Sequence, residues 1–283
     1  MAGARVRRLR DGDIDRAIAL TDLEGWGYTR GDFRLLRALS PEGCFAAEVD
    51  GRVVGVLSTT AYGSLAFLGA VVVDPAFRGR GIGTQLMEAA LAHLDRSGIE
   101  TVRLNSYLHV VAFYERLGFR KEFENIRWQG APAEARSTGV RPAERRDFPH
   151  LLRIDEASFG ASRRDLLTRL HGRFPRSFLV AGRDGELVGY LVGNTASLAV
   201  EIGPWVVRAG HPEVARDLFH GLMACSSGAN YAFTAPTPNR DANAFAESLG
   251  YQEAFRTVRM VRGTDAYQGV PEAIWGFAGL EKG

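Results

Sequence analysis

The chain has 283 residues, of which 46% are hydrophobic and 24% are charged, and its formal net charge is +2 at pH 7. This length predicts two domains with ordinary hydrophobic cores, and the near balance of acids and bases argues against a nucleic-acid partner. Since no apolar run approaches the roughly 20 residues of a membrane span and the basic N-terminus lacks the apolar core of a secretion signal, we expect a cytoplasmic protein without a membrane partner.

Strand and helix signals alternate along the first half of the chain. Residues 4–9 predict a short strand, and a helix follows from about Asp13, a favoured N-cap residue. A second helix over residues 30–39 ends before a proline, which disfavours helix in the residue ahead of it. Asp50-Gly51 lies between two β-like runs and predicts a hairpin. The remaining signals predict strands at 65–73, at 101–105 and up to residue 128, with helices at 84–97 and 110–117.

The second half repeats the first at a shift of about 134 positions, in the same order of signals. Asp50-Gly51 corresponds to Asp184-Gly185, and, after a slip of two positions, Leu117-Gly118-Phe119 corresponds to Leu249-Gly250-Tyr251. Two copies of one fold are therefore predicted, joined by a segment rich in Ala, Pro, Ser and Gly. The predicted organisation is a first domain at 1–130, a linker at 131–139 and a second domain at 140–283.

The segment Arg78-Gly79-Arg80-Gly81-Ile82-Gly83 stands between a predicted strand and a predicted helix. Glycines there let bare backbone N–H groups face an anion at the positive end of a helix. A P-loop is excluded because no lysine follows Gly83. A dinucleotide fingerprint fits poorly, since its third glycine would fall on Thr84 and the next strand does not end in an acid.

The same turn resembles motif A of the GNAT superfamily of N-acetyltransferases, [QR]-x-x-G-x-[GA], through Arg78, Gly81 and Gly83. Downstream, Ala112 to Phe119 resembles the F-Y-x-x-x-G-F motif of that family, and the likeness covers residues 4–128. The resemblance implies an α/β (α+β) class with two tandem GNAT folds. Each would have a mixed, mostly antiparallel central sheet flanked by helices and splayed after the motif A strand.

The resemblance also implies acetyl-CoA as cosubstrate. Tyr114 matches the position of the general acid that protonates the departing thiolate and also lies at the cofactor. Asn105 is either a turn former or a cofactor contact. The other implied cofactor-binding residues are Val71, Val72, Val73, Arg78, Gly79, Arg80, Gly81, Ile82, Gly83 and Thr84.

The acceptor side is less defined. Many members of the family carry a glutamate on the strand before motif A, but residues 65–71 contain no acid. The candidates for the base are Asp22, Glu24, Asp32 and a water chain, and an acceptor with a lower pKa would also serve. Aromatic residues near that region favour a small apolar or cyclic amine as acceptor, although packing is the more ordinary role for such side chains. The candidate acceptor-binding residues are Trp26, Tyr28, Asp32, Asp155 and Arg163. No metal is expected, since the two cysteines, Cys44 and Cys225, are widely separated and predict free, buried thiols.

The second copy lacks the donor site. At the shift of about 134, Gly81 and Gly83 fall on Ala215 and Asp217, and Tyr114 falls on Ala246 after the slip. We therefore expect one active site, in the first domain, that acetylates a primary amine of a small molecule. The alternatives are a non-catalytic acyl-CoA sensor and an acyltransferase for longer acyl groups. The sequence leaves open the identity of the acceptor and whether the chain forms a homodimer.

Overall fold

The computed structural model describes residues 3–135, 139–196, 199–264 and 269–283. It divides into two compact units, Met1–Leu104 with Lys282, and Asn105–Glu281 with Gly283. The predicted linker includes residues 136–138, which lie outside the described residues. The predicted domain limits at 130 and 140 stay a prediction.

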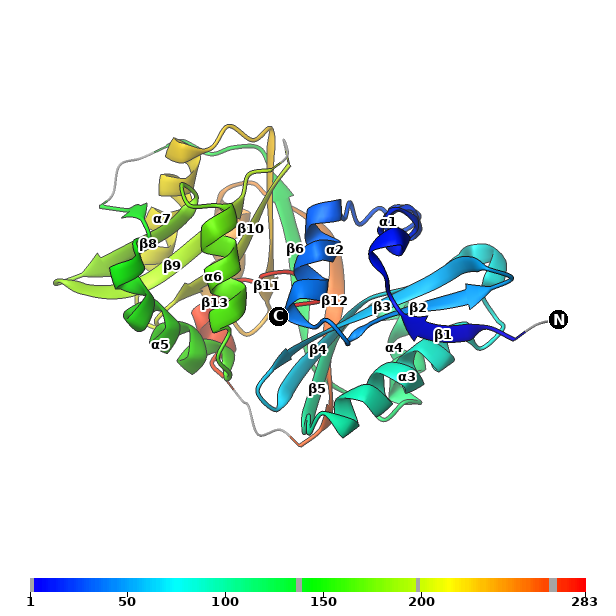
Figure 1. The fold of residues 1–283 in the computed structure, drawn as a ribbon. Coiled ribbons are helices and arrows are strands. Elements are labelled where there is room, and N and C mark those ends of the chain that lie inside the picture. The colour runs from blue at the N-terminus through cyan, green and yellow to red at the C-terminus, as the bar shows by residue number, and fades with distance from the viewer. Residues whose placement is uncertain (1–2, 136–138, 197–198, 265–268) are drawn as a thin grey trace. The chain divides into compact units, whose positions relative to one another are not determined.

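The first unit is a mixed sheet with helices packed against it (Figure 1). Strand order is β1-β2-β3-β4-β5, antiparallel throughout except that β5 runs parallel to β4. Helices α1 and α2 pack on β3, and α3 packs along β2, β3 and β4. The elements are β1 (Arg5–Arg8), α1 (Ile14–Asp22), α2 (Arg30–Leu39), β2 (Cys44–Val49), β3 (Arg52–Tyr62), β4 (Leu65–Val73), α3 (Ile82–Arg96) and the start of β5 (Thr101–Tyr107), with 3₁₀ turns at Asp11–Asp13 and Pro75–Phe77.

The repeated hairpin is confirmed in both copies. Asp50 and Gly51 have φ angles of +48° and +76°, and Asp184 and Gly185 have +52° and +82°. Two successive positive φ angles are what a two-residue hairpin turn needs to match the twist of its strands. The Asp-Gly pair supplies them because Asp tolerates the left-handed region and Gly has no side chain to clash there.

Strand β4 separates from β5 toward its C-terminal end, while it stays paired with β3. It pairs with β5 only from Leu65 to Leu68. Its pairing with β3 shifts between Gly69 and Val72, where Ala70 has a φ of +49°. A bulge of this kind inserts an unpaired residue and bends the strand. The backbone of residues 69–73 therefore has no partner on β5, as the predicted splay requires.

The second unit contains a strand from each copy at its centre. Its sheet order is β12-β6-β11-β10-β9-β8-β7, with β13 beside β10. Strand β6, the last of the first copy, lies between β11 and β12 of the second copy and is antiparallel to both. This exchange was not predicted from the sequence. The elements are α4 (Val111–Glu115), β6 (Arg120–Gly130), β7 (Arg141–Pro142), α5 (Phe148–Phe159), α6 (Arg164–Arg173), β8 (Phe178–Arg183), β9 (Glu186–Asn194), β10 (Ala199–Val207), α7 (Pro212–Cys225), β11 (Asn230–Pro236), α8 (Arg240–Ser248), β12 (Gln252–Gly263) and β13 (Ile274–Gly276), with 3₁₀ turns at Leu108–Val110, Arg145–Asp147 and Pro271–Ala273.

Each unit has its own hydrophobic core. The first is built from α1, α2 and the inner residues of β2 to β4, and the second from α7, α8 and the strands β6 and β8 to β11. The mixed, mostly antiparallel sheet flanked by helices confirms the predicted fold class. Both cysteines are free, but Cys225 is exposed at the end of α7 rather than buried, unlike Cys44. Within the described residues, none of the helices combines the length and apolarity needed to cross a membrane.

Candidate active site

The turn after β4 holds two of its glycines in the left-handed region. Gly79 and Gly81 have φ angles of +76° and +75°, which a residue with a side chain adopts at a cost of about 1–2 kcal/mol. Gly81 is the N-cap of α3. The helix therefore begins at Ile82, two residues before the predicted start at residue 84, and Gly83 and Thr84 lie in its first turn rather than ahead of it.

Among the residues that the structure describes, no side chain caps the N-terminus of α3. Gly81 offers no side chain, and the first turn contains no acidic residue. The first helical hydrogen bond joins Gln85 N–H to the Gly81 carbonyl at 3.0 Å. The N–H groups of residues 82–84 thus have no helical acceptor, and the turn before them is exposed to solvent. Together with the positive end of the helix dipole, these donors can bind a phosphate group.

Both arginines of the turn are bonded to the protein. Arg78 donates from Nε to the Val73 carbonyl at 2.9 Å and pairs with Glu24. Arg80 donates to the Ala76 carbonyl at 3.1 Å. These bonds tie each side chain to backbone next to the turn, so the arginines help to fix its shape while they remain at the surface.

Asp74 anchors the start of the turn, and the sequence did not identify it. Its carboxylate accepts hydrogen bonds from Arg16 at 2.6 Å, from Arg52 at 3.2 Å and from the Ala76 N–H at 3.1 Å. Burial alone would raise the pKa of Asp74, but the Ala76 N–H and Arg16 outweigh it and leave that pKa below its ordinary value. The carboxylate therefore stays charged and holds the C-terminal end of β4 in place.

Tyr114 belongs to the second unit. Its ring is buried against Phe113 and Phe119, with centroid distances of 5.0 and 6.1 Å. In the described part of the chain, no group accepts a hydrogen bond from its hydroxyl or donates one to it. Burial raises the pKa of the phenol above its ordinary value. The hydroxyl of Tyr114 is thus protonated and makes no hydrogen bond within the described residues, as a proton donor requires.

Asn105, also in the second unit, is part of a buried amide network. Its Nδ2 donates to the Leu280 carbonyl at 2.6 Å, and its Oδ1 accepts from Asn125 Nδ2 at 2.9 Å. Asn125 Nδ2 also donates to Thr257 Oγ1 at 3.1 Å. The Asn105 side chain is therefore held by the protein on both of its polar atoms, and its contact with the cofactor stays a prediction.

The predicted acceptor residues of the first unit form a small aromatic group. The ring centroids of Trp26 and Tyr28 are 6.2 Å apart, and those of Tyr28 and Phe33 are 5.4 Å apart. Asp32 caps α2, because its Oδ2 accepts from the Thr29 N–H at 2.9 Å and from the Thr29 hydroxyl at 2.6 Å. This bonding makes Asp32 a poor candidate for the base.

Asp155 and Arg163 form a fully buried ion pair in the second unit. Arg163 donates from Nη2 and Nε to the two carboxylate oxygens of Asp155 at 2.6 and 3.1 Å, and Tyr190 donates its hydroxyl to the same carboxylate. The Arg163 side chain also lies over the Phe159 ring, 4.0 Å from its centroid. The pair has structural partners, and its predicted contact with an acceptor stays a prediction. Tyr190 gave no signal in the sequence, since it lies within an ordinary strand pattern.

The second copy has a shorter turn at the place of the glycine turn. Four residues, 208–211, separate β10 from α7, whereas eight, 74–81, separate β4 from α3. The N-cap of α7 is His211, so the predicted correspondence of Gly81 with Ala215 and of Gly83 with Asp217 is wrong. The constant shift fails there because the turn has lost four residues.

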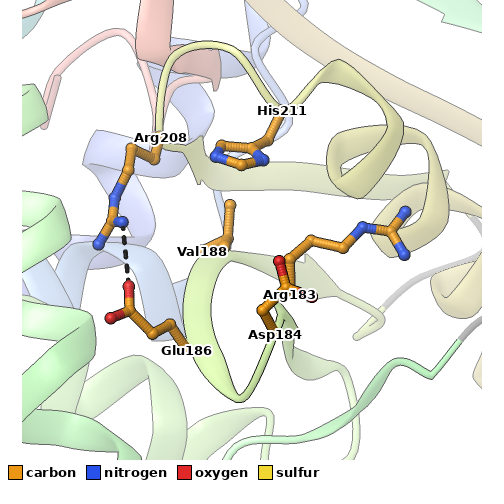
Figure 2. A pocket seen from close by; sticks show the side chains of 6 residues that line it. All are labelled: Arg183, Asp184, Glu186, Val188, Arg208 and His211. Carbon is orange, nitrogen blue, oxygen red and sulfur yellow. Dashed lines mark hydrogen bonds and ion pairs between the residues drawn. The ribbon is translucent and has the colours of Figure 1, made fainter.

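The N-terminus of α7 is closed to an anion in two ways. Pro212 occupies the first helical position and has no N–H. The carboxylate of Glu213 accepts a hydrogen bond from the backbone N–H of Glu213. This bond, with Arg183 and His211 nearby, lowers the pKa of Glu213, so a charged carboxylate already occupies this helix end. An open pocket of about 340 Å³ lies beside it. Figure 2 shows the side chains that line this pocket, with Arg208 paired to Glu186. Its lining residues are Arg183, Asp184, Glu186, Val188, Arg208 and His211.

The correspondence of Tyr114 with Ala246 is supported by the backbone. Phe119 N–H bonds to the Tyr114 carbonyl at 3.1 Å, and Tyr251 N–H bonds to the Ala246 carbonyl at 3.1 Å. The two helix ends therefore match residue for residue. The second copy keeps the helix end and replaces the phenol by a buried methyl group.

Known proteins resemble both halves of the chain. A family model described as acetyltransferase (GNAT) family matches residues 16–119, and one described as acetyltransferase (GNAT) domain matches residues 151–276. The holothin acyltransferase of a Pseudoalteromonas species is 26% identical over 92% of this chain and 88% of its own.

Solved structures share the fold over nearly the whole chain. A candidate acetyltransferase from Pyrococcus horikoshii superposes with a TM-score of 0.85 at 22% identity, covering 100% of this chain and 97% of its own. A tandem GNAT protein from the clavulanic acid biosynthesis pathway gives a TM-score of 0.63 at 17% identity, covering 92% and 98%.

Proposed function

Because the chain belongs to the GNAT superfamily of acyltransferases and carries two GNAT domains, we propose that it transfers the acetyl group of acetyl-CoA to a primary amine of a small molecule. The observation that carries this proposal is the turn at Gly79 and Gly81, which leads into the uncapped N-terminus of α3. The second copy has closed the equivalent helix end, which supports a single donor site in the N-terminal domain.

The donor is held by backbone groups in this proposal. The N–H groups of residues 79–84 bind the pyrophosphate, and the backbone of Val71 and Val73, beyond the stretch of β4 that pairs with β5, binds the pantetheine arm. The separation of β4 from β5 supports this assignment, because the edge of β4 beyond Leu68 is not covered by pairing with β5.

The transfer proceeds by direct attack. The neutral amine nitrogen forms a bond to the thioester carbonyl carbon, and an N–H donor on β4 stabilises the oxyanion. The C–S bond then breaks, the sulfur takes the proton of the Tyr114 hydroxyl, and the amine gives up its proton to a base. Tyr114 supports this role because its pKa is raised by burial, so that it is protonated, and because its hydroxyl makes no hydrogen bond within the described residues.

Thermal unfolding with and without acetyl-CoA tests donor binding. Acetyl-CoA at about 100 times its dissociation constant stabilises the folded protein by about 2.7 kcal/mol, and the absence of any shift at saturation would contradict the proposal. Release of free thiol with a panel of primary amines tests catalysis. Stabilisation without thiol release from any amine would instead favour a non-catalytic acyl-CoA sensor.

A longer acyl donor is the second candidate. It is favoured by the likeness to a relative that is named an acyltransferase rather than an acetyltransferase. Acetyl-, butyryl- and octanoyl-CoA compared in the same assay separate the two, since the preferred donor has the highest kcat/KM.

A further inference from the structure

Strand β10 of the second copy is the counterpart of β4, the strand before the glycine turn. The hairpin of β3 and β4 and the hairpin of β9 and β10 are paired in the same register, and each residue of the second lies 134 positions after its counterpart in the first. The corresponding pairs are Leu68 with Thr59 and Ile202 with Gly193, and Val72 with Val56 and Val206 with Tyr190. The two strands can therefore be compared residue for residue.

Both strands lose their parallel neighbour at the same place. Strand β4 pairs with β5 only over Leu65–Leu68, and β10 pairs with β11 only over Ala199–Glu201. Beyond these stretches, each copy has an edge that its own parallel strand does not cover. In the first copy this is the edge proposed for the pantetheine arm. Its counterpart in the second copy is the edge of β10 over residues 203–207.

The short strand β13 covers this edge of β10. It runs antiparallel to β10, with Gly276 opposite Trp205 and Ile274 opposite Val206. At these same two residues the other edge of β10 is paired with β9. Because a strand has only two edges, β13 lies on the side of β11, where the parallel pairing has ended.

Specific contacts from several elements hold β13 there. The N–H of Phe277 donates to a carbonyl of β11 at 3.1 Å, and Asn239 Nδ2 donates to the Ile274 carbonyl at 3.0 Å. The Trp275 side chain is buried, with its ring centroid 5.3 Å from that of Trp205. The segment 274–277 thus lies between the separated strands and is bonded to both.

Gly203 leaves the space that the segment needs. Its φ is +153°, and a side-chain carbon at this position would lie 1.7 Å from the Phe277 carbonyl oxygen. A side chain at residue 203 would therefore displace the segment from β10.

We propose that β13 is a built-in occupant of the second copy, which takes on β10 the place that the pantetheine arm takes on β4. This inference rests on the proposed function. The two amide groups of pantetheine and the backbone of an extended peptide offer a strand edge the same kinds of hydrogen bond. Because β13 belongs to the same chain, its effective concentration at this edge is high, and free acyl-CoA does not displace it. The second copy is thus closed at the strand edge as well as at the N-terminus of α7, and the chain binds one acyl-CoA.

Amide hydrogen exchange of the full chain, with and without acetyl-CoA, tests the proposal. Without ligand, residues 205–207 and 274–277 should exchange slowly, and acetyl-CoA should change their rates by less than about twofold. The amides of residues 71–73 that face away from β3 should gain protection, up to about 100-fold when acetyl-CoA is at about 100 times its dissociation constant. Calorimetry should give one acetyl-CoA per chain.

Gly203→Ala and Gly210→Ala form a matched pair of variants. Both place a side chain at a positive φ in the second unit, but the carbon added at Gly210 meets no neighbouring atom. Exchange at residues 274–277 should be at least about tenfold faster in Gly203→Ala than in Gly210→Ala, and equal rates would overturn the assignment of the segment to this edge. If Gly203→Ala does not fold, the wild-type exchange rates decide the question.

The outcomes separate this proposal from the proposed function. Two acetyl-CoA molecules per chain, protection of residues 205–207 by acetyl-CoA, or exchange of residues 274–277 as fast as in an unbonded peptide would each overturn the role of β13 while the donor site in the first copy stands. If acetyl-CoA does not bind, the proposed function fails. Slow exchange at residues 274–277 would in that case make β13 an ordinary structural strand rather than a substitute for a ligand.

Discussion

Replacing Tyr114 by phenylalanine removes one hydroxyl from a site where it makes no hydrogen bond within the described residues. Its ring contacts with Phe113 and Phe119 are retained. The free energy of unfolding should therefore change by no more than about 0.5 kcal/mol. The loss of a general acid should lower kcat by about 10²–10⁴-fold, which corresponds to about 2.7–5.4 kcal/mol at about 1.36 kcal/mol per tenfold change. A catalytic role thus predicts a large fall in kcat with almost no change in the free energy of unfolding, which a purely structural role does not.

The assay is steady-state thiol release with saturating acetyl-CoA, measured from pH 6 to pH 9. Because burial raises the pKa of Tyr114, the phenol stays protonated over this range, and the ratio of wild-type to variant kcat should not change with pH. Tyr251→Phe is the matched control, since it also removes a buried hydroxyl without a partner in the described residues. A loss of less than about tenfold in Tyr114→Phe, or an equal loss in Tyr251→Phe, would refute the assignment.

Gly81→Ala and Gly210→Ala place a side chain at φ angles of +75° and +89°, and in both cases the added carbon meets no neighbouring atom. The free energy of unfolding, measured by thermal unfolding, should therefore fall by a similar amount in both variants, about 1–2 kcal/mol. Only Gly81→Ala should weaken acetyl-CoA binding in calorimetry, and equal affinities in the two variants would count against the turn as the donor site. Asp147→Asn should lower stability at pH 7 by about 1–2 kcal/mol, because Asp147 accepts two bonds of 2.7 Å from the partly exposed Arg141 and one from the Glu144 N–H. The bond from Arg141 lowers the pKa of Asp147 in the folded protein. The stability that Asp147 contributes is therefore fully present above the ordinary pKa of about 3.9 and is lost as the pH falls through the lower pKa of the folded state. The free energies of unfolding of wild type and Asp147→Asn should therefore converge in acid.

Local patterns predicted the elements that local physics determines. The Asp50-Gly51 hairpin and the strand at 65–73 were predicted from turn chemistry and an apolar run, and both lie where expected. The exchange of β6 was not predictable, because an alternating strand pattern shows which face is buried but not which strand lies beside it. The turn before α7, which is four residues shorter than the turn before α3, was also missed. The two copies were compared at a constant shift, and this comparison cannot detect a change of length within a turn.

Candidate site residues were likewise predicted where a local motif marks them and missed where distant segments determine their surroundings. The glycine turn and Tyr114 were predicted because they lie in segments that resemble the two GNAT motifs, and their roles stay predictions. Asp74 was missed because a carboxylate in a sequence is most often surface charge. One of the bonds that hold its carboxylate comes from Arg16, which lies far away in the chain.

The two copies meet the same requirement at a helix N-terminus in different ways. The first N–H groups of any helix need an acceptor. In α7, Pro212 removes one of these donors and the Glu213 carboxylate serves the end of the helix, so the end is complete without a ligand. In α3 the donors face water, and a phosphate that replaces this water gains charge-assisted hydrogen bonds at little conformational cost, because Gly79 and Gly81 already hold the turn open. Donor binding should therefore stabilise the first unit and leave α7 unaffected, and hydrogen exchange of residues 79–86 against residues 212–218 with acetyl-CoA would show protection at the former only.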